Sequence, residues 1–300
     1  MSNLLNITAI ILTFNEGIHL QRCLDSVKEL TDKIYVVDAY STDTTVEIAL
    51  KAGVQLLQNS WPGNHSLQFN WALTQIPPDT SWILRIDADE VLELGLIMEL
   101  REKMSLIPPN VVALRFNRKM IFQGHLLRYG GLRANRVQRL FRYGFGHSES
   151  RWMDEHIVVD GIAQDLSGAI IDNNLNSLSF WIDKHNNYAS KEALELLNLK
   201  YQFSSNSEKV HGSVNSVKRF LKKNLYASLP SGFRSFVYYF YRYIFLLGIL
   251  DGQRGRQFHF LQGFWYRYLV DCKVAEVERY MQLHQVSPKE AIHKVLNIQL

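Results

Sequence analysis

The sequence predicts an α/β fold with a mostly parallel central sheet. Its N-terminal third alternates between short apolar runs without helical period and segments with the three-to-four-residue spacing of amphipathic helices. Strands joined in this way by helices are typical of a parallel sheet with right-handed crossovers. Polar side chains also follow three of the expected strands where each one ends, and open α/β sheets usually bind their ligands there.

The expected elements follow one another closely. Strands are predicted at 7–13, 33–38, 54–58 and 82–86, with helices between them, the second ending near 52 and the third over about 67–75. The apolar positions of the first helix are Ile18, Cys23, Leu24, Val27 and Leu30. A further strand is expected at 111–116, followed by a hairpin or active-site loop over 118–131, which contains three glycines.

Three acids follow the fourth expected strand within four residues: Asp87, Asp89 and Glu90. Like charges this close repel one another and raise one another's pKa values, which a divalent cation would relieve. Hard cations such as Mg²⁺ and Mn²⁺ take oxygen ligands, so the cluster indicates a metal site. Taken alone, an Asp-x-Asp sequence is more often an exposed turn that caps the next helix, here expected over 93–105. The neighbouring motifs decide between the two.

Three motifs carry a resemblance to a known family. They are Ile-Leu-Thr-Phe-Asn-Glu (11–16), Val-Val-Asp-Ala-Tyr-Ser-Thr-Asp (36–43) and Arg-Ile-Asp-Ala-Asp-Glu (85–90). In this order and spacing the chain resembles the family 2 glycosyltransferases of the GT-A fold, which is Rossmann-like. Later motifs are similar to the bacterial lipopolysaccharide-core and capsule β-glycosyltransferases of that family: Gln68-x-Asn70-x-Ala72-Leu73, Arg139-Leu-Phe-Arg142, Lys184-His-Asn-x-Tyr188 and Leu250-Asp-Gly252.

The resemblance implies a nucleotide-sugar site at the strand ends. The implied nucleotide contacts are Thr13, Asn15, Glu16, Asp38 and Asp87. Asp89 would be the direct ligand of a Mg²⁺ or Mn²⁺ ion on the donor diphosphate, with Asp87 as a second candidate ligand. Such a cation neutralises the charge that develops on the leaving diphosphate. The residues alone also allow Asp38 to cap the following helix.

Four arginines fall at every third position: Arg133, Arg136, Arg139 and Arg142. Because apolar residues separate them, we expect a loop and a strand rather than a helix with one basic face. Arg133 and Arg139 are the candidates for contacts with the donor phosphates. The alternative for both is ordinary solvated charge.

The segment Arg151-Trp-Met-Asp-Glu-His156 combines a tryptophan, two carboxylates and a histidine. Burial against an aromatic ring raises the pKa of a carboxyl group toward the range in which it can accept a proton. An inverting glycosyl transfer needs one such base to deprotonate the acceptor hydroxyl. The resemblance places this acid a few residues before a strand, which selects Glu155. Asp154 stays open as the alternative, because many relatives have a Glu-Asp pair that this sequence lacks.

A GT-A catalytic domain over 1–175 and a helical C-terminal region over 176–300 are therefore expected. Helices are predicted over 178–200 and 214–229, the second being basic and amphipathic. The aromatic segment 233–250 is shorter than the ~20 residues of a spanning helix, and its tyrosines and Arg242 suit the headgroup layer. We expect it to lie in the interface of an anionic membrane. The alternative is a helix packed inside the protein.

Composition sets further limits. The net charge of +4 is too small to indicate a nucleic-acid partner. Cys23 and Cys272 form no disulfide or zinc-binding pattern, so both are expected to be small buried hydrophobic residues in a reducing compartment. A helical stripe at Leu261, Phe264, Trp265, Tyr268, Leu269 and Cys272 indicates internal packing, and a short amphipathic helix is expected from Ser287. No secretory signal pattern is present at the N-terminus, so a cytoplasmic, peripheral (monotopic) location on the inner face of the cell membrane is expected.

The sequence thus predicts a metal-dependent inverting glycosyltransferase. It would move a hexose from a nucleotide sugar, expected to be UDP-linked, to a lipid-anchored saccharide in the synthesis of lipopolysaccharide core, capsule or a similar polymer. One alternative is a sugar-phosphate nucleotidyltransferase, which also uses acids at strand ends and a metal. The other is an inactive, membrane-docked carbohydrate-binding protein.

Overall fold

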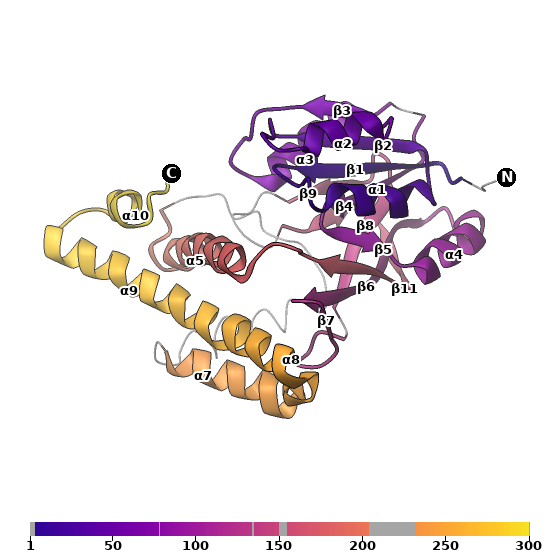
Figure 1. Cartoon of the computed structure of the whole chain (residues 1–300). Helices are drawn as coiled ribbons and strands as arrows, with labels where there is room; N and C mark the ends of the chain where they lie inside the picture. The colour runs from indigo at the N-terminus through magenta and orange to yellow at the C-terminus, as the bar shows by residue number, and fades with distance from the viewer. Residues whose placement is uncertain (1–3, 78, 134, 150–154, 204–231, 300) are drawn as a thin grey trace. The chain divides into compact units, whose positions relative to one another are not determined.

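The computed structural model describes residues 4–299 apart from 78, 134, 150–154 and 204–231. Clustering of contacts separates two compact units (Figure 1). The first unit runs to Glu149 and continues from Glu155 to Leu175, and the second begins at Asn176.

The first unit is built on one large sheet. Its strands are β1 (Ile7–Thr13), β2 (Lys33–Asp38), β3 (Gln55–Gln58), β4 (Trp82–Asp87), β5 (Glu90–Leu92), β6 (Val111–Phe122), β7 (His125–Leu127), β8 (Arg136–Arg142) and β11 (Ile162–Asn173). The strand order is β3-β2-β1-β4-β8-β6-β11-β5, with β7 beside β6. A separate ribbon pairs β9 (Gly146–Ser148) with β10 (Ile157–Val159).

The sheet is entirely parallel only in its first half, although β6 and β11 are also parallel to each other. Strands β3, β2, β1 and β4 are parallel, as the strand–helix alternation predicted. Beyond β4 the sheet is mixed, because β8 is antiparallel to both β4 and β6, and β5 is antiparallel to β11. The expectation of a mostly parallel sheet is therefore wrong for the second half. No described helix separates β6, β7 and β8, and strands joined without a crossover pair in antiparallel fashion.

Helices cover both faces of the sheet. They are α1 (Leu20–Lys28), α2 (Thr45–Lys51), α3 (His65–Thr74) and α4 (Leu94–Lys103). Alternate residues of β1 belong to two separate cores, since Ile7 and Ile11 pack with α1 and α4, whereas Ile10 packs with α3. This double burial explains why β1 reads as a continuous apolar run. The predicted inner face of α1 is correct except for Ile18, which precedes the helix and is exposed.

Two details near the acid cluster decide between alternatives that the sequence left open. Glu90 does not cap the following helix but begins the short strand β5, and Glu93 occupies the N-cap position of α4. The hairpin expected within 118–131 is confirmed, since β6 continues to Phe122 and turns at Gln123 and Gly124 into the antiparallel strand β7.

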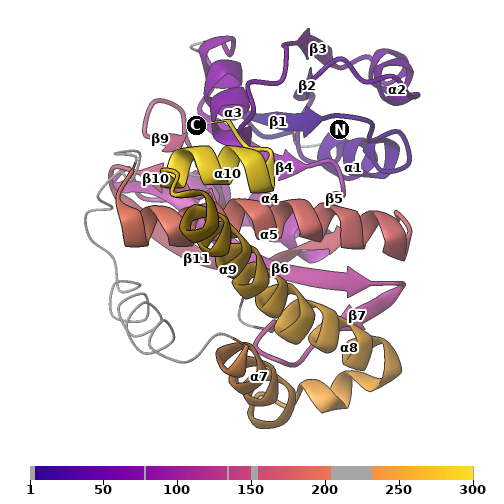
Figure 2. The same ribbon diagram turned by 90° about the vertical axis from the view of Figure 1, so that its left-hand side faces the viewer.

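The second unit is helical (Figure 2). Its helices are α5 (Leu178–Tyr201), α7 (Phe233–Phe240), α8 (Gly252–Phe258), α9 (Tyr266–His284) and α10 (Pro288–Leu296). Side chains of α5, α9 and α10 form its core, with Leu194, Leu197, Val277 and Ile292 fully buried. The helix predicted over 214–229 lies outside the described residues. Among the helices that are described, none is both long and apolar enough to cross a membrane.

Two helical predictions for this unit are wrong in detail. The segment 233–250 is not one helix, because a π-helical stretch (Tyr241–Phe245) and a 3-10 turn (Gly248–Asp251) follow α7. The stripe predicted to face inward is displaced, since Tyr268 and Cys272 are exposed and the buried positions are Tyr266 and Val270. Cys23, by contrast, is fully buried as predicted.

Candidate functional site

The loops after β1 and β2 are fastened to each other by Asp38. This carboxylate is fully buried and accepts hydrogen bonds from Thr13 Oγ1 at 3.0 Å and from the Ser41 backbone N–H at 2.8 Å. The Ser41 hydroxyl donates to it as well, at 2.5 Å. Both carboxylate oxygens of Asp38 thus accept hydrogen bonds from neighbouring residues of the protein. Asp38 shapes the loop that a nucleotide would meet. It does not cap the following helix, because the Thr45 N–H at the start of α2 donates to Asp43 instead.

Asn15 makes a second link between the same loops. Its side-chain oxygen accepts from the Thr42 backbone N–H at 2.8 Å, and its own N–H donates to Ser41 Oγ at 2.8 Å. Asn15 and Tyr40 both have positive φ values, of 56° and 59°. Such backbone conformations are uncommon outside glycine and often occur at ligand-binding loops. The two loops therefore form one pre-shaped edge beyond β1 and β2.

Glu16 is directed toward a buried histidine. Its carboxylate lies 2.5 Å from Nδ1 of His19, and Nε2 of the same ring accepts from the Leu175 backbone N–H at 2.9 Å. Because Nε2 accepts, the ring carries its proton on Nδ1 and donates it to Glu16. Glu16 thus connects the first loop to the end of the first unit at Leu175.

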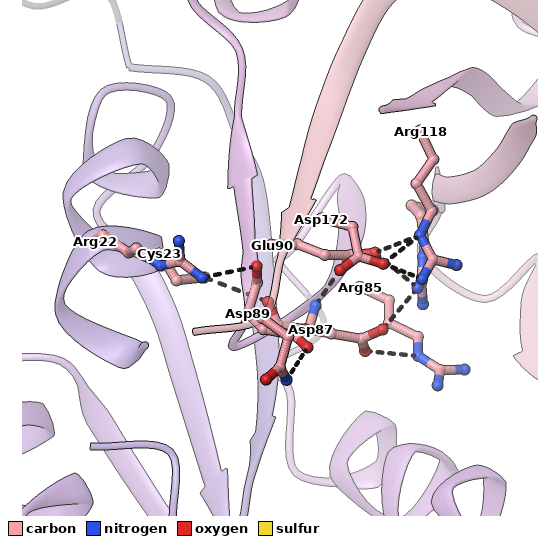
Figure 3. Close-up of polar contacts among 10 residues, drawn as sticks. Arg22, Cys23, Arg85, Asp87, Asp89, Glu90, Arg118 and Asp172 are labelled. Atoms are coloured by element: carbon pink, nitrogen blue, oxygen red, sulfur yellow. Dashed lines mark hydrogen bonds and ion pairs between the residues drawn. The ribbon is translucent and has the colours of Figure 1, made fainter. Parts of the chain in front are cut away.

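Asp87, at the end of β4, is paired with arginine (Figure 3). Arg139 Nη2 lies 2.7 Å from Asp87 Oδ2, and Arg85 Nε lies 3.9 Å from Oδ1. Burial acts to raise the pKa of Asp87, but the guanidinium groups of Arg139 and Arg85 outweigh it and hold the pKa well below its usual range. Asp87 is therefore a carboxylate at neutral pH, with its charge already balanced.

Glu90 is fully buried and contacts Asp87 and two arginines. Its carboxylate accepts from the Asp87 backbone N–H at 3.0 Å and lies 3.2 Å from Arg139 and 3.6 Å from Arg118. Burial raises its pKa to about 7; Arg139 opposes the rise, and the charge of Asp87 adds to it. Asp172, opposite Glu90 in the β5–β11 pair, forms an ion pair with Arg118. Burial raises the pKa of Asp172 as well, against the opposing effect of Arg118.

Asp89 differs from both of these acids. Its Oδ2 accepts from the Asn174 side chain at 3.0 Å, and its backbone carbonyl accepts from Arg22 Nη2 at 3.1 Å. The Asn173 N–H also donates to that carbonyl, at 3.1 Å. No arginine is paired with the Asp89 carboxylate in the described ion pairs. The turn is held in place through its backbone, which leaves a carboxylate with oxygen available for a cation.

These residues fit a divalent ion only in part. Within the described ranges no three His, Cys, Asp or Glu side chains are grouped as a metal site. Asp87 is a poor ligand, because a cation would compete with Arg139 for it. Asp89 is a suitable ligand on the chemistry of its carboxylate. A cation at this turn would therefore need most of its oxygens from a bound ligand, such as a diphosphate.

Glu155, half-buried, lies after β9 in the sequence and two residues before β10. The Glu149 N–H donates to the His156 carbonyl at 2.9 Å, and Ser148 lies opposite Ile157. Ser148 in turn accepts from Arg85 Nη1 at 3.2 Å. Arg85 is buried and lies close enough to Glu155 and Asp87 for both acids to oppose the lowering of its pKa by burial. Arg85 thus links the Asp87–Glu90 turn to the segment that carries Glu155.

The remaining predicted residues are less informative. Arg133 is exposed in the turn before β8, and Asp154 lies outside the described residues. Arg139 is directed to Asp87 and Glu90, where the sequence suggested donor phosphate. Sequence reasoning missed Arg22, Arg118, Asp172 and Asn174. The partners of these residues lie far away in the chain. The pairing of β11 with both β5 and β6 brings Arg118, Asp172 and Asn174 to the acids, and Arg22 reaches the same turn from α1.

Comparison with known proteins identifies similar sequences. The profile of glycosyl transferase family 2 matches residues 8–142. The lipopolysaccharide core biosynthesis glycosyltransferase LpsC of Rhizobium meliloti is 29% identical over 196 residues, which cover 63% of this chain and 71% of that protein. An uncharacterised glycosyltransferase of Rickettsia conorii is 42% identical over 90 residues, covering 30% of this chain and 31% of that protein.

The extent of these similarities is limited. Two further curated relatives, at 37% and 43% identity, are matched over 28% and 32% of their own length, so the chain spans about a third or less of several relatives. Among solved structures, glucosyl-3-phosphoglycerate synthase from Mycobacterium tuberculosis is 18% identical, with a TM-score of 0.32 over 37% of this chain and 43% of that chain. A likeness of that size carries no inference about ligands or activity.

Proposed function

Since this chain belongs to glycosyl transferase family 2 through residues 8–142, we propose that it transfers a hexose from a nucleotide sugar to a lipid-anchored saccharide. The donor is expected to be UDP-linked. The reaction inverts the anomeric centre, and the product contributes to a cell-surface polysaccharide such as lipopolysaccharide core or capsule. The similarity to LpsC, whose name assigns it to lipopolysaccharide core biosynthesis, supports this acceptor class.

One observation carries the proposal for the donor site. Strands β1, β2 and β4 are parallel neighbours, so their carboxyl ends bring Thr13–Glu16, the Asp38 loop and Asp87–Glu90 to one edge of the sheet. The first two loops are hydrogen-bonded into a single edge, and the third presents the carboxylate of Asp89. The nucleoside lies along the first two loops, and the diphosphate lies at Asp89.

A Mg²⁺ or Mn²⁺ ion, when bound, would neutralise charge on the leaving diphosphate. Asp89 would be its protein ligand, and Asp87 would serve mainly to orient Arg139 beside the phosphates. Arg139 then has two roles, since its charge both balances Asp87 and Glu90 and adds positive potential at this edge. Arg133, exposed in the preceding turn, remains a further candidate for phosphate contact.

Glu155 is the proposed base. It takes the proton from the acceptor hydroxyl while that oxygen attacks the anomeric carbon from the face opposite the diphosphate. The half-buried position of Glu155 and its connection through Ser148 to Arg85 support this role, because a base must be held at a fixed place relative to the donor. Asp154 is the alternative base, on the same segment.

A donor screen tests the proposal. The full chain is incubated with Mn²⁺ and a panel of nucleotide sugars, and release of nucleoside diphosphate is measured with and without lipid-linked saccharide. A glycosyltransferase releases the nucleoside diphosphate from its donor, and the anomeric configuration of the product reports inversion. A sugar-phosphate nucleotidyltransferase would instead consume a nucleoside triphosphate and release pyrophosphate. Failure to bind or turn over any sugar nucleotide would leave only the inactive binding protein.

A further inference from the structure

Helix α7 presents its apolar side chains outward. Its exposed residues are Phe233, Phe236, Val237 and Phe240, and the pattern continues at Tyr241 and Ile244. Their spacing is that of one helical face. In a helix that packs on a water-soluble core this face would be buried, so the orientation of α7 is the reverse of the usual one.

The inward face of α7 is polar. Ser235 is its buried residue, and Ser235 Oγ lies 3.4 Å from the buried carboxylate of Asp271 on α9. Arg234 Nε donates to the same carboxylate at 2.8 Å, and the Gly232 N–H donates to it at 2.9 Å. Because each of these groups is satisfied inside the second unit, α7 is fixed with its aromatic face outward. The exposure of that face is therefore a property of the packing and not of a loosely attached helix.

An apolar tip follows α7 where the chain turns back. The π-helical stretch ends at Phe245, which is 68% exposed, and Leu247 and Ile249 are each 49% exposed. Leu250 is 57% exposed, and the chain then enters α8. Leu247 has a positive φ of 60°, a conformation that costs energy for a branched residue and is retained only where the surrounding structure fixes it. Figure 2 shows α7 and α8 adjacent at this end of the second unit.

The exposed charges next to the tip are positive. Between residues 232 and 270 the chain contains one acid, Asp251, and five arginines, of which Arg234 and Arg267 are paired with Asp271 and Glu192 and Arg242 is buried. Asp251 is buried and lies 3.1 Å from Nε2 of His259, so it adds no negative charge to the surface. Arg254 and Arg256, just beyond the tip, are exposed. The surface thus combines large apolar side chains with positive charge.

We propose that the outer face of α7 and the tip Phe245–Leu250, together called the apolar face, insert into one leaflet of an anionic bilayer. Aromatic and aliphatic side chains gain free energy at the boundary between headgroups and acyl chains, and the arginines pair with lipid phosphates. A second copy of this chain fits less well, because two such faces would bring like charges together. The inference extends the proposed function, because a lipid-anchored acceptor lies at a membrane surface. It rests on the proposed function only for the identity of that acceptor.

Vesicle co-sedimentation of the full chain tests the inference without any donor. Wild type should bind vesicles that contain phosphatidylglycerol, should bind pure phosphatidylcholine more weakly, and should be released from the anionic vesicles as salt rises. Substituting Phe245→Ser with Leu250→Ser should reduce partitioning about tenfold or more, because two large apolar groups no longer leave water. Substituting Arg254→Gln with Arg256→Gln should weaken binding to anionic vesicles by about tenfold and flatten its salt dependence.

The matched control is Leu94→Ser with Met98→Ser. These two residues are also large and exposed, but they lie on α4 of the first unit. The control should bind vesicles as wild type does. Equal loss in the control and the tip variant would overturn the inference, as would a tip variant that binds normally.

A depth-sensitive label supplies a second readout. An environment-sensitive fluorophore is attached at Phe245→Cys in a Cys272→Ser background, since Cys23 is buried. Its emission should shift to the blue with anionic vesicles, whereas a label at Met98→Cys should not shift. A shift that depends on protein concentration without lipid would show self-association and would contradict the proposal. Donor turnover is measured separately, so failure of vesicle binding and failure of the proposed reaction are distinguishable.

Discussion

Asp87 and Asp89 are separated by one residue, yet their environments differ. The Asp87 carboxylate is paired with Arg139 at 2.7 Å, whereas the Asp89 carboxylate accepts only from the neutral amide of Asn174 among the described hydrogen bonds. A carboxylate whose charge is already balanced binds a cation weakly, because the cation must displace the resident arginine. The difference in partners therefore assigns distinct roles to the two acids within the proposed site.

Arg139 should be important for stability as well as for activity. Arg139→Met leaves Asp87 and the buried Glu90 without their closest cation, which should cost about 3 kcal/mol in the free energy of unfolding. Adding Glu90→Gln should recover part of the loss, because the buried acid is then neutral. Urea denaturation of the single and double variants measures both effects.

The matched control for that cycle is Arg136→Met on the same strand. The side chains of Arg136 and its partner Asp165 are 40% and 43% exposed. An exposed pair of this kind contributes less than about 1 kcal/mol. If the Arg136 variant lost as much free energy of unfolding as the Arg139 variant, the buried charges would contribute no more to stability than the exposed pair.

Glu155→Gln should separate chemistry from donor binding. The amide cannot accept the acceptor proton, so kcat should fall by about 10²–10⁴, whereas the Kd for the nucleotide sugar should change by less than about twofold. Initial rates and calorimetric titration of the donor measure the two quantities. Asp154→Asn is the comparison: a larger loss of kcat there would move the base to Asp154. Parallel loss of donor affinity would contradict the assignment of Glu155 to the acceptor.

Among the helices and strands, those that depend only on their own residues could be predicted from the sequence. Strands β1 and β2 have the bounds that their apolar runs indicated, because a buried strand needs only its own residues to be recognised. Strand β5 could not be found in this way. It has three residues, and it exists because Glu90 pairs with Asp172, far along the chain. The same pairing brings Asn174 to the site, and the pairing of β6 with β11 brings Arg118, so these residues were equally beyond local patterns.

The displaced stripe before and within α9 has a different cause. A π-helical segment (His259–Trp265) precedes α9, and its wider i to i+5 bonding rotates later side chains relative to a 3.6-residue period. Tyr266 and Val270 consequently occupy the buried face where Tyr268 and Cys272 were expected. Periodicity identified the helix correctly but could not detect this local change in pitch.

Helix α5 carries a prediction about pH. His185 stacks on Trp181 with ring centroids 3.5 Å apart, and burial lowers the pKa of His185 to about 4, although the Trp181 carbonyl favours the proton. Between pH 6.5, the ordinary pKa of histidine, and about pH 4, His185 is protonated in the unfolded chain but stays neutral in the folded chain. Stability should therefore fall as pH drops from about 6.5 to 4, by about 2 kcal/mol after allowance for partial exposure.

His185→Gln should remove that part of the pH dependence. Urea midpoints measured from pH 7 to pH 4 should show a shallower decline for the variant than for wild type. His293→Gln, which removes an exposed histidine from α10 of the same unit, is the control for loss of any histidine. Identical slopes for wild type and His185→Gln would contradict the burial argument.

For the whole molecule, the two units have different parts in the proposed function. The first unit contains the strand ends to which we assign the donor, and the second exposes the apolar face that we assign to the bilayer. The family and the parallel half of the sheet could be predicted from the first 90 residues, because their motifs are local. The charge network around Glu90 and the outward orientation of α7 could not, because both depend on packing between distant segments.

Titration of UDP into the full chain tests the central claim most directly, which is that Asp89 holds a donor diphosphate through a divalent cation. With Mn²⁺, wild type should bind UDP at least about tenfold more tightly than it does with EDTA. Asp89→Asn should behave with Mn²⁺ as wild type does with EDTA, since the amide keeps the turn but loses the charge. Asp165→Asn, which removes an exposed acid from β11, should bind like wild type. UDP binding that is indifferent to both EDTA and Asp89→Asn would contradict the account.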